Sequence, residues 1–227
     1  MTHLLLLHGA IGAQDQLEPL AQALSDDFLL DRLNFAGHGG QPMTGPFAID
    51  IFAEQVMRYL DNQQIDRVDI FGYSMGGYVA LYLAKMYPHR VRRIFTLGTK
   101  FEWTPDIAAR ETKMLNPEII AEKIPVFAAA LEKRHAPNDW KQVLSKTADM
   151  MMGLGRANPL VLDDFSGIDL PVLLGLGDSD TMVTRAETEA VLNRLPNARL
   201  TVLPQTPHPI EKADVRLLQS EILSFFK

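Results

Sequence analysis

The chain has 227 residues, of which 47% are hydrophobic and 22% are charged, a composition typical of a globular protein with one large core. Its 22 basic and 28 acidic residues leave a net charge of −6, and no basic cluster exceeds the run of Arg90, Arg92 and Arg93, which argues against nucleic acid as a partner. The absence of cysteine excludes disulfides, thiolate nucleophiles and cysteine-bound metals.

The first ten residues, MTHLLLLHGA, contain four consecutive leucines with no basic residue before them. A signal peptide needs a cationic start and a longer apolar run, so this segment predicts a buried strand. No apolar stretch approaches the length of a membrane span. We therefore expect a cytoplasmic protein that does not insert into membranes.

Short apolar runs and amphipathic patterns alternate along the chain, which predicts an α/β fold with a mostly parallel sheet and helices on both faces. In FAIDIFAEQVMRYLDN the apolar residues recur every three or four positions and share one helix face, and a similar pattern ends the chain. We expect six strands, at residues 2–7, 28–34, 67–73, 92–97, 171–176 and 199–203.

The alternation stops between residues 100 and 169, where no strand is predicted. Five prolines punctuate this region, and proline suits the first turn of a helix when Thr or Asn precedes it as a cap. We expect four or five short helices here. We therefore expect a sheet-containing core, residues 1–99 and 170–227, and a helical lid, residues 100–169, inserted between the fourth and fifth strands of a single domain.

The stretch VDIFGYSMGGYVALYLA, residues 68–84, contains the pattern G-x-S-x-G at Gly72, Ser74 and Gly76. A strand precedes the pattern and a helix follows it, which is the context that a nucleophile elbow requires. The sharp turn leaves room only for small neighbours, so the glycines allow Ser74 to project above the sheet. The N–H of Met75, at the start of the helix, is then placed to stabilise an oxyanion.

A serine nucleophile needs a base, and the base needs an acid that orients it. Asp178 and Asp180 follow the fifth strand in GLGDSD, and His208 follows the sixth in PQTPHPIEK. Because parallel strands deliver their loops to one edge of the sheet, these side chains are expected near Ser74. The residues alone leave either aspartate open as the acid.

These pieces together resemble the α/β-hydrolase superfamily over essentially the whole chain. The matching segments are LLLLHGA, NFAGHGG, GYSMGG, GLGDSD and PQTPHPIEK. The resemblance implies a catalytic triad of Ser74, Asp180 and His208, because Asp180 has the family's Gly-x-x-Asp spacing from Gly177, with Asp178 as the alternative. It also implies an oxyanion hole formed by the N–H groups of Ala10 and Met75.

The remaining candidates concern the substrate pocket and the other histidines. We place Trp103, His8 and Tyr73 in the pocket, beneath an insertion rich in aromatic residues and methionine that suits an apolar acyl or alkyl group. His135 is expected to be a solvated residue at a helix end. No two histidines have the spacing of metal ligands and no dinucleotide fingerprint is complete, so neither a metal nor a cofactor is implied.

The predicted function is hydrolysis of a small or medium carboxylic ester by a serine esterase, with a small ester-type molecule as the partner. The same three residues could instead cleave a thioester or a C–C bond, or perform a lyase step like that of menaquinone synthesis. GYSMGG resembles the lyase family, but Tyr78 stands where that family typically has arginine. A non-catalytic receptor with a hydrolase-like fold is the third hypothesis, after the esterase and the other reactions of the same three residues. The sequence does not indicate an oligomeric state.

Overall fold

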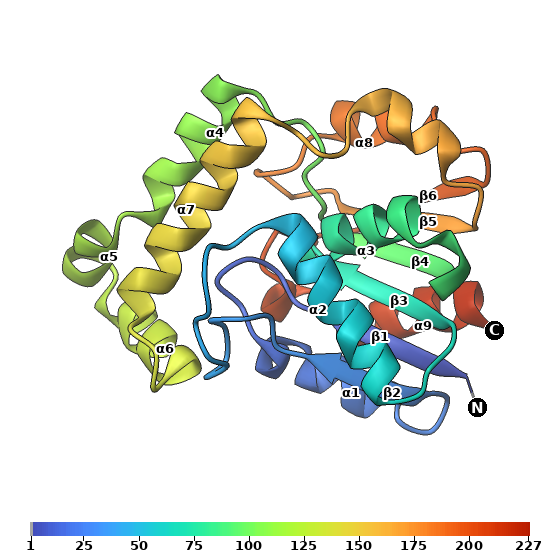
Figure 1. Cartoon of the computed structure of the whole chain (residues 1–227), viewed down its shortest axis with the longest axis horizontal. Helices are drawn as coiled ribbons and strands as arrows, with labels where there is room; N and C mark the ends of the chain where they lie inside the picture. Colours follow the sequence, from blue (N-terminus) through green and yellow to red (C-terminus); the bar gives the residue numbers. More distant parts are fainter. Residues whose placement is uncertain (1) are drawn as a thin grey trace.

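The computed structural model describes residues 2–227, and these contain one six-stranded sheet in which all neighbouring strands are parallel. The strand order is β2-β1-β3-β4-β5-β6 (Figure 1). Each predicted strand is found within one residue of its expected ends, so the six-stranded parallel sheet is confirmed. The strands are β1 (His3–Leu7), β2 (Leu29–Leu33), β3 (Val68–Tyr73), β4 (Val91–Leu97), β5 (Val172–Gly177) and β6 (Ala198–Leu203).

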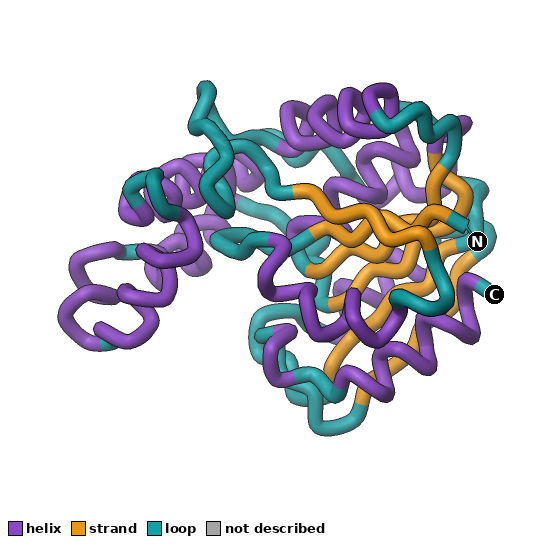
Figure 2. The backbone as a smooth tube through the Cα atoms, turned by 90° about the horizontal axis from the view of Figure 1, so that it is seen from below, coloured by secondary structure: helices purple, strands orange, loops and turns teal. Residues whose placement is uncertain are grey.

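Helices cover both faces of the sheet (Figure 2), which explains why the central strands β3 and β5 are buried at every residue. Successive residues of β1 point to opposite faces, so Leu5 and Leu7 join one core cluster and Leu4 and Leu6 join the other. The first cluster includes side chains of α2 (Ile49–Asn62), α3 (Met75–Met86) and α8 (Arg185–Leu192). The second includes side chains of α1 (Glu18–Leu24) and α9 (Val215–Phe226).

The segment between β4 and β5 forms four α-helices, in agreement with the expected number. Thr104 and Asn116 cap the first two through their side-chain oxygens, and Pro105, Pro117 and Pro125 begin the first three. The helices are α4 (Pro105–Thr112), α5 (Pro117–Lys123), α6 (Pro125–His135) and α7 (Trp140–Arg156). The last is not short, because no proline interrupts its 17 residues.

These four helices lie beyond one end of the sheet, on the opposite side of the molecule from both chain termini (Figure 1). Because the strands start on the side of the termini, the carboxyl ends of the strands face the inserted helices. The loops that follow the strands therefore lie next to the insertion. Within residues 2–227, no helix combines the length and apolar character needed to cross a membrane.

Candidate active site

Ser74 lies at the junction of β3 and α3, in a backbone conformation that residues other than glycine rarely adopt. Its φ is 51° and its ψ is −116°. The neighbouring glycines explain how the turn is accommodated: a Cβ on Gly72 would lie 2.5 Å from the Cα of Gly77, and a Cβ on Gly76 would collide with the carbonyl oxygen of Leu7. The strain at Ser74 is thus held by close backbone packing on both sides of the turn.

Asp180 and His208 are brought together by the loops after β5 and β6. The Nδ1 atom of His208 lies 2.8 Å from Oδ2 of Asp180, whose side chain is only 2% exposed. The other oxygen of Asp180 accepts the N–H groups of Met182 and Val183. Burial raises the pKa of Asp180, but the hydrogen bonds from His208 and these two N–H groups outweigh it, so the pKa lies below its ordinary value.

Asp178 has a different environment, because its carboxylate is bonded to its own loop and to the loop after β6. Its Oδ1 accepts the Ser179 hydroxyl and the Thr206 N–H, and the residue is exposed. It makes no hydrogen bond to His208 among the contacts of the described residues. Of the two aspartates left open by the sequence, the geometry therefore favours Asp180 as the partner of His208.

Gly98 is a site residue that the sequence analysis missed. It follows β4 with a φ of +59°, and a Cβ at this position would lie 3.2 Å from Oδ2 of Asp180 and 3.4 Å from Nδ1 of His208. A side chain here would therefore press on the Asp180–His208 pair. The signal in the sequence is a glycine directly after a predicted strand, in TLGTK.

A cavity of about 50 Å³ lies between the loops that carry Ser74 and His208 and the insertion. Ser74 and His208 both line it, together with Ala10 and Met75, the two residues expected to form the oxyanion hole. Met75 is the first residue of α3, so its N–H has no acceptor within that helix. The remaining wall is largely apolar and comes mainly from α7 and the loop after β5, through Met150, Met151, Leu154, Met182 and Val183.

The structure corrects two of the three predicted pocket residues. Trp103 lines the cavity as expected, but His8 and Tyr73 do not. Tyr73 is buried beneath the loop after β6, where its hydroxyl donates to the backbone oxygen of His208 at 3.0 Å. His8 is completely buried, and both of its ring nitrogens contact backbone groups: Nδ1 lies 2.8 Å from the Gly9 oxygen and Nε2 accepts the Phe35 N–H.

The expectation that His135 is solvated is wrong. It is fully buried at the end of α6, with Nδ1 accepting the Gly39 N–H and Nε2 at 3.0 Å from the oxygen of Ile11. The insertion is thereby fastened to two loops of the core. The ring of His38 lies between His8 and His135, at centroid distances of 5.2 and 5.7 Å.

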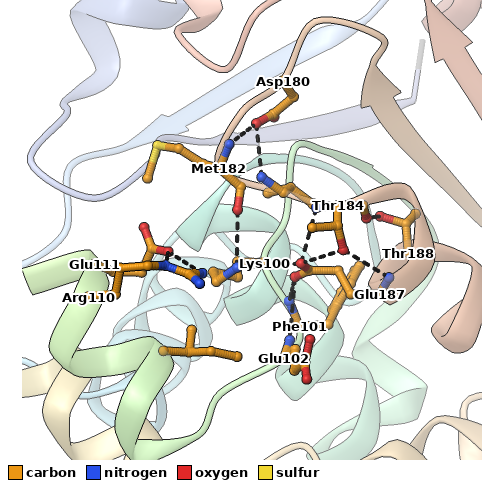
Figure 3. Close-up of polar contacts among 12 residues, drawn as sticks. Lys100, Phe101, Glu102, Arg110, Glu111, Asp180, Met182, Thr184, Glu187 and Thr188 are labelled. Atoms are coloured by element: carbon orange, nitrogen blue, oxygen red, sulfur yellow. Dashed lines mark hydrogen bonds and ion pairs between the residues drawn. The ribbon is translucent and has the colours of Figure 1, made fainter.

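Two charged side chains in the cavity wall were also not predicted. Lys100 donates through Nζ to the backbone oxygen of Met182 at 3.0 Å and to Oε2 of Glu187 at 3.4 Å, as Figure 3 shows. Glu111 is buried and accepts Arg110 through one carboxylate oxygen. Single charged residues in a helical insertion have no pattern that distinguishes a cavity wall from solvent. Residues 2–227 contain no group of three or more His, Asp or Glu side chains arranged to hold a metal ion.

Comparison with known proteins places this geometry in context. Residues 2–117 match the sequence model of the alpha/beta hydrolase fold. A pimeloyl-[acyl-carrier protein] methyl ester esterase of Neisseria meningitidis serogroup C is 28% identical over 89% of this chain and 85% of its own length. Esterase YbfF of Escherichia coli K12 is 25% identical over 94% and 89%, and a Bacillus subtilis protein named "Putative 2-succinyl-6-hydroxy-2,4-cyclohexadiene-1-carboxylate synthase" is 25% identical over 96% and 88%.

Solved structures agree on the fold. The enol-lactonase from Burkholderia xenovorans LB400 superposes with a TM-score of 0.80 at 20% identity, covering 99% of this chain and 91% of the lactonase. At that identity the likeness extends to the fold alone.

Proposed function

Because the chain belongs to the alpha/beta hydrolase fold family, we propose that it is a serine hydrolase that cleaves a small or medium carboxylic ester through an acyl-enzyme intermediate. The fold and the relatives named as esterases support an ester-hydrolysing enzyme. The observation that carries the proposal is that Ser74, held in a strained turn, shares one cavity with His208, whose Nδ1 lies 2.8 Å from a buried Asp180.

In the proposed reaction the Ser74 hydroxyl attacks the ester carbonyl while Nε2 of His208 accepts its proton. Asp180 accepts a hydrogen bond from the Nδ1–H group of His208, which leaves Nε2 free to act as the base. The protonated His208 then donates to the departing alkoxide. A water molecule, activated by His208 in turn, attacks the acyl group, releases the carboxylic acid and restores Ser74.

We assign stabilisation of the negative charge that develops on the ester carbonyl oxygen to the N–H groups of Ala10 and Met75. These residues lie in the loop after β1 and at the start of α3. Both residues line the cavity beside Ser74. A pair of fixed backbone donors stabilises an oxyanion more than a ground-state carbonyl, which is how such a site lowers the barrier. Because the inserted helices contribute much of the opposite wall, we also propose that residues 100–169 act as the lid of this site.

The lyase alternative also has a relative, the Bacillus subtilis synthase, over most of the chain. A carboxylate substrate would need a free cation in the cavity. Tyr78 donates its hydroxyl to Asn158, and Lys100 already faces Glu187. Among the described residues that line the cavity, Lys100 is the only Lys or Arg, and its pairing favours an uncharged ester over a dicarboxylate.

The test combines turnover with covalent labelling. We expect the wild-type protein to hydrolyse p-nitrophenyl butyrate and to react at one residue with a fluorophosphonate, located by mass spectrometry. Ser74→Ala should lower turnover by at least about a thousandfold and abolish the label. Ser166→Ala, an exposed serine in the insertion, is the matched control and should retain both. A label that persists in Ser74→Ala would show that another residue is the nucleophile.

A further inference from the structure

A second and larger cavity, of about 450 Å³, lies behind the active-site cavity. Its inner wall consists of Phe101, Leu160, Phe165 and Val191, each 5% exposed or less. Its rim includes Val161, an apolar side chain that is 52% exposed. The cavity is therefore an apolar space that reaches the surface between α8 and the segments on either side of the inserted helices.

The partition between the two cavities consists of one residue, Trp103, and two pairs of contacting side chains. Trp103 lines both cavities. Lys100 lines the active-site cavity and Glu187 the second, and their side chains approach to 3.4 Å. Tyr78 and Asn158 are likewise on opposite sides and are joined by a hydrogen bond. The two spaces are thus separated by one layer of side chains.

The two pairs are held in place by further hydrogen bonds to the backbone, whereas Trp103 is not. Glu187 accepts the N–H groups of Phe101 and Thr184 in addition to facing Lys100 (Figure 3). Asn158 contacts the backbone of Phe101 as well as Tyr78. The indole Nε1 of Trp103, by contrast, is buried without a hydrogen-bond partner among the described residues. Since no polar contact holds the indole, Trp103 is the part of the partition that a rotamer change can open.

We propose that the second cavity binds the distal part of a hydrocarbon chain of the ester substrate, and that Trp103 gates its connection to Ser74. This rests on the proposed ester hydrolysis. The active-site cavity, at about 50 Å³, holds only a short group, so a longer chain needs further space. The second cavity supplies that space, and in its wall the side chains of Glu187 and Asn158 are already hydrogen-bonded, which leaves the indole N–H of Trp103 as the unpaired polar group named above. An uncharged, unbranched chain fits such a wall better than a polar group does.

The decisive variant fills the second cavity with a side chain from α8. Ala190 lies on α8 and lines that cavity alone, so Ala190→Phe removes chain space while every residue of the partition keeps its identity. Removing room for two methylenes should lower the octanoate-to-acetate ratio of kcat/KM by about fifteenfold, since each buried CH₂ contributes roughly a fourfold effect. Trp103→Ala should raise the same ratio. Ala130→Phe, on an exposed position of α6 outside both cavities, is the matched control.

Two substrate series show whether the hydrocarbon chain that enters the second cavity belongs to the acyl group or to the alcohol of the ester. p-Nitrophenyl esters from acetate to octanoate vary the acyl chain, and acetates from ethyl to octyl vary the alcohol. A fall in the Ala190→Phe ratio confined to one series assigns the cavity to that chain. Unchanged ratios in both series would overturn the proposal.

Failure of the proposed function gives a different result, namely no wild-type turnover of any ester. The cavity is then tested with 1-decanol by calorimetry, without catalysis. Binding that Ala190→Phe weakens at least about tenfold would support a chain site, by the same methylene estimate. Equal binding by both proteins, or none by either, would overturn it.

Discussion

Acid should destabilise this protein through its buried histidines, and His8 allows the effect to be isolated. Its two ring nitrogens have opposite roles: Nδ1 donates to the Gly9 oxygen, and Nε2 accepts the Phe35 N–H. A second proton on Nε2 would face a donor, inside a site with no exposure to water. Burial is the main reason that the pKa of His8 falls from 6.5 to about 4.

The sign and size of the effect follow from proton linkage. Between about pH 6.5 and pH 4 the unfolded chain binds a proton at residue 8 that the folded protein excludes, so stability falls as the pH falls. A pKa lowered from 6.5 to about 4 corresponds to a loss of about 3 kcal/mol when the pH reaches 4, compared with neutral pH. Burial also lowers the pKa of His38 and of His135, so both add losses of the same sign.

The assay is urea unfolding of the wild type and His8→Gln at a series of pH values from about 7.5 to 4.5. Glutamine offers a donor and an acceptor but does not titrate, so the variant is less stable at neutral pH yet loses less on acidification. We expect the difference between the two unfolding free energies to shrink by about 2 to 3 kcal/mol across the range. His3→Gln, at a partly exposed histidine bonded to Asp31, is the control. Parallel curves for wild type and His8→Gln would refute the argument.

The other predictions concern the loops that carry Asp180 and His208 and the segment that packs against them. Asp180→Asn should lower kcat by about a thousandfold or more, since an amide cannot hold the same tautomer of His208. Asp178→Asn should change kcat by less than about tenfold. The reverse order would identify Asp178 as the acid. Gly98→Ala should cost about tenfold or more in kcat, because the new Cβ presses on Asp180 and His208. Gly45→Ala, also at a positive φ but with nothing within 4 Å of its Cβ, should cost stability only, and equal kcat values in the two alanine variants would contradict the contact.

The strands and the loops that carry Ser74, Asp180 and His208 could be predicted because they depend on local patterns. Buried parallel strands are continuous apolar runs, and the carboxyl ends of such strands share one edge of the sheet. The spacing of turns and strands was therefore enough to locate each loop. The choice between Asp178 and Asp180 depended on a family spacing, because both follow the same strand and only the folded loop separates their environments.

The residues that were misplaced depend on contacts between distant segments. His135 appeared to be an ordinary helix end, yet its partners lie at Ile11 and Gly39, more than ninety positions away in the chain. Tyr73 directly precedes Ser74 and was expected in the pocket, but its hydroxyl reaches the backbone of His208 instead. Neither partner is encoded by periodicity or by a motif. Such pairings follow only from the three-dimensional arrangement of loops.

The short segment after β4 connects the two halves of the site. Gly98 packs against the Asp180–His208 pair, and the Thr99 hydroxyl donates to the backbone oxygen of Ser74. One residue later, Lys100 donates to Met182, whose own N–H is bonded to Asp180. The segment then reaches Trp103 in the partition between the cavities. Because these contacts follow one another along six residues, a substitution that shifts the backbone here should alter kcat as well as chain-length preference. A substitution on α8, such as Ala190→Phe, should alter the preference alone.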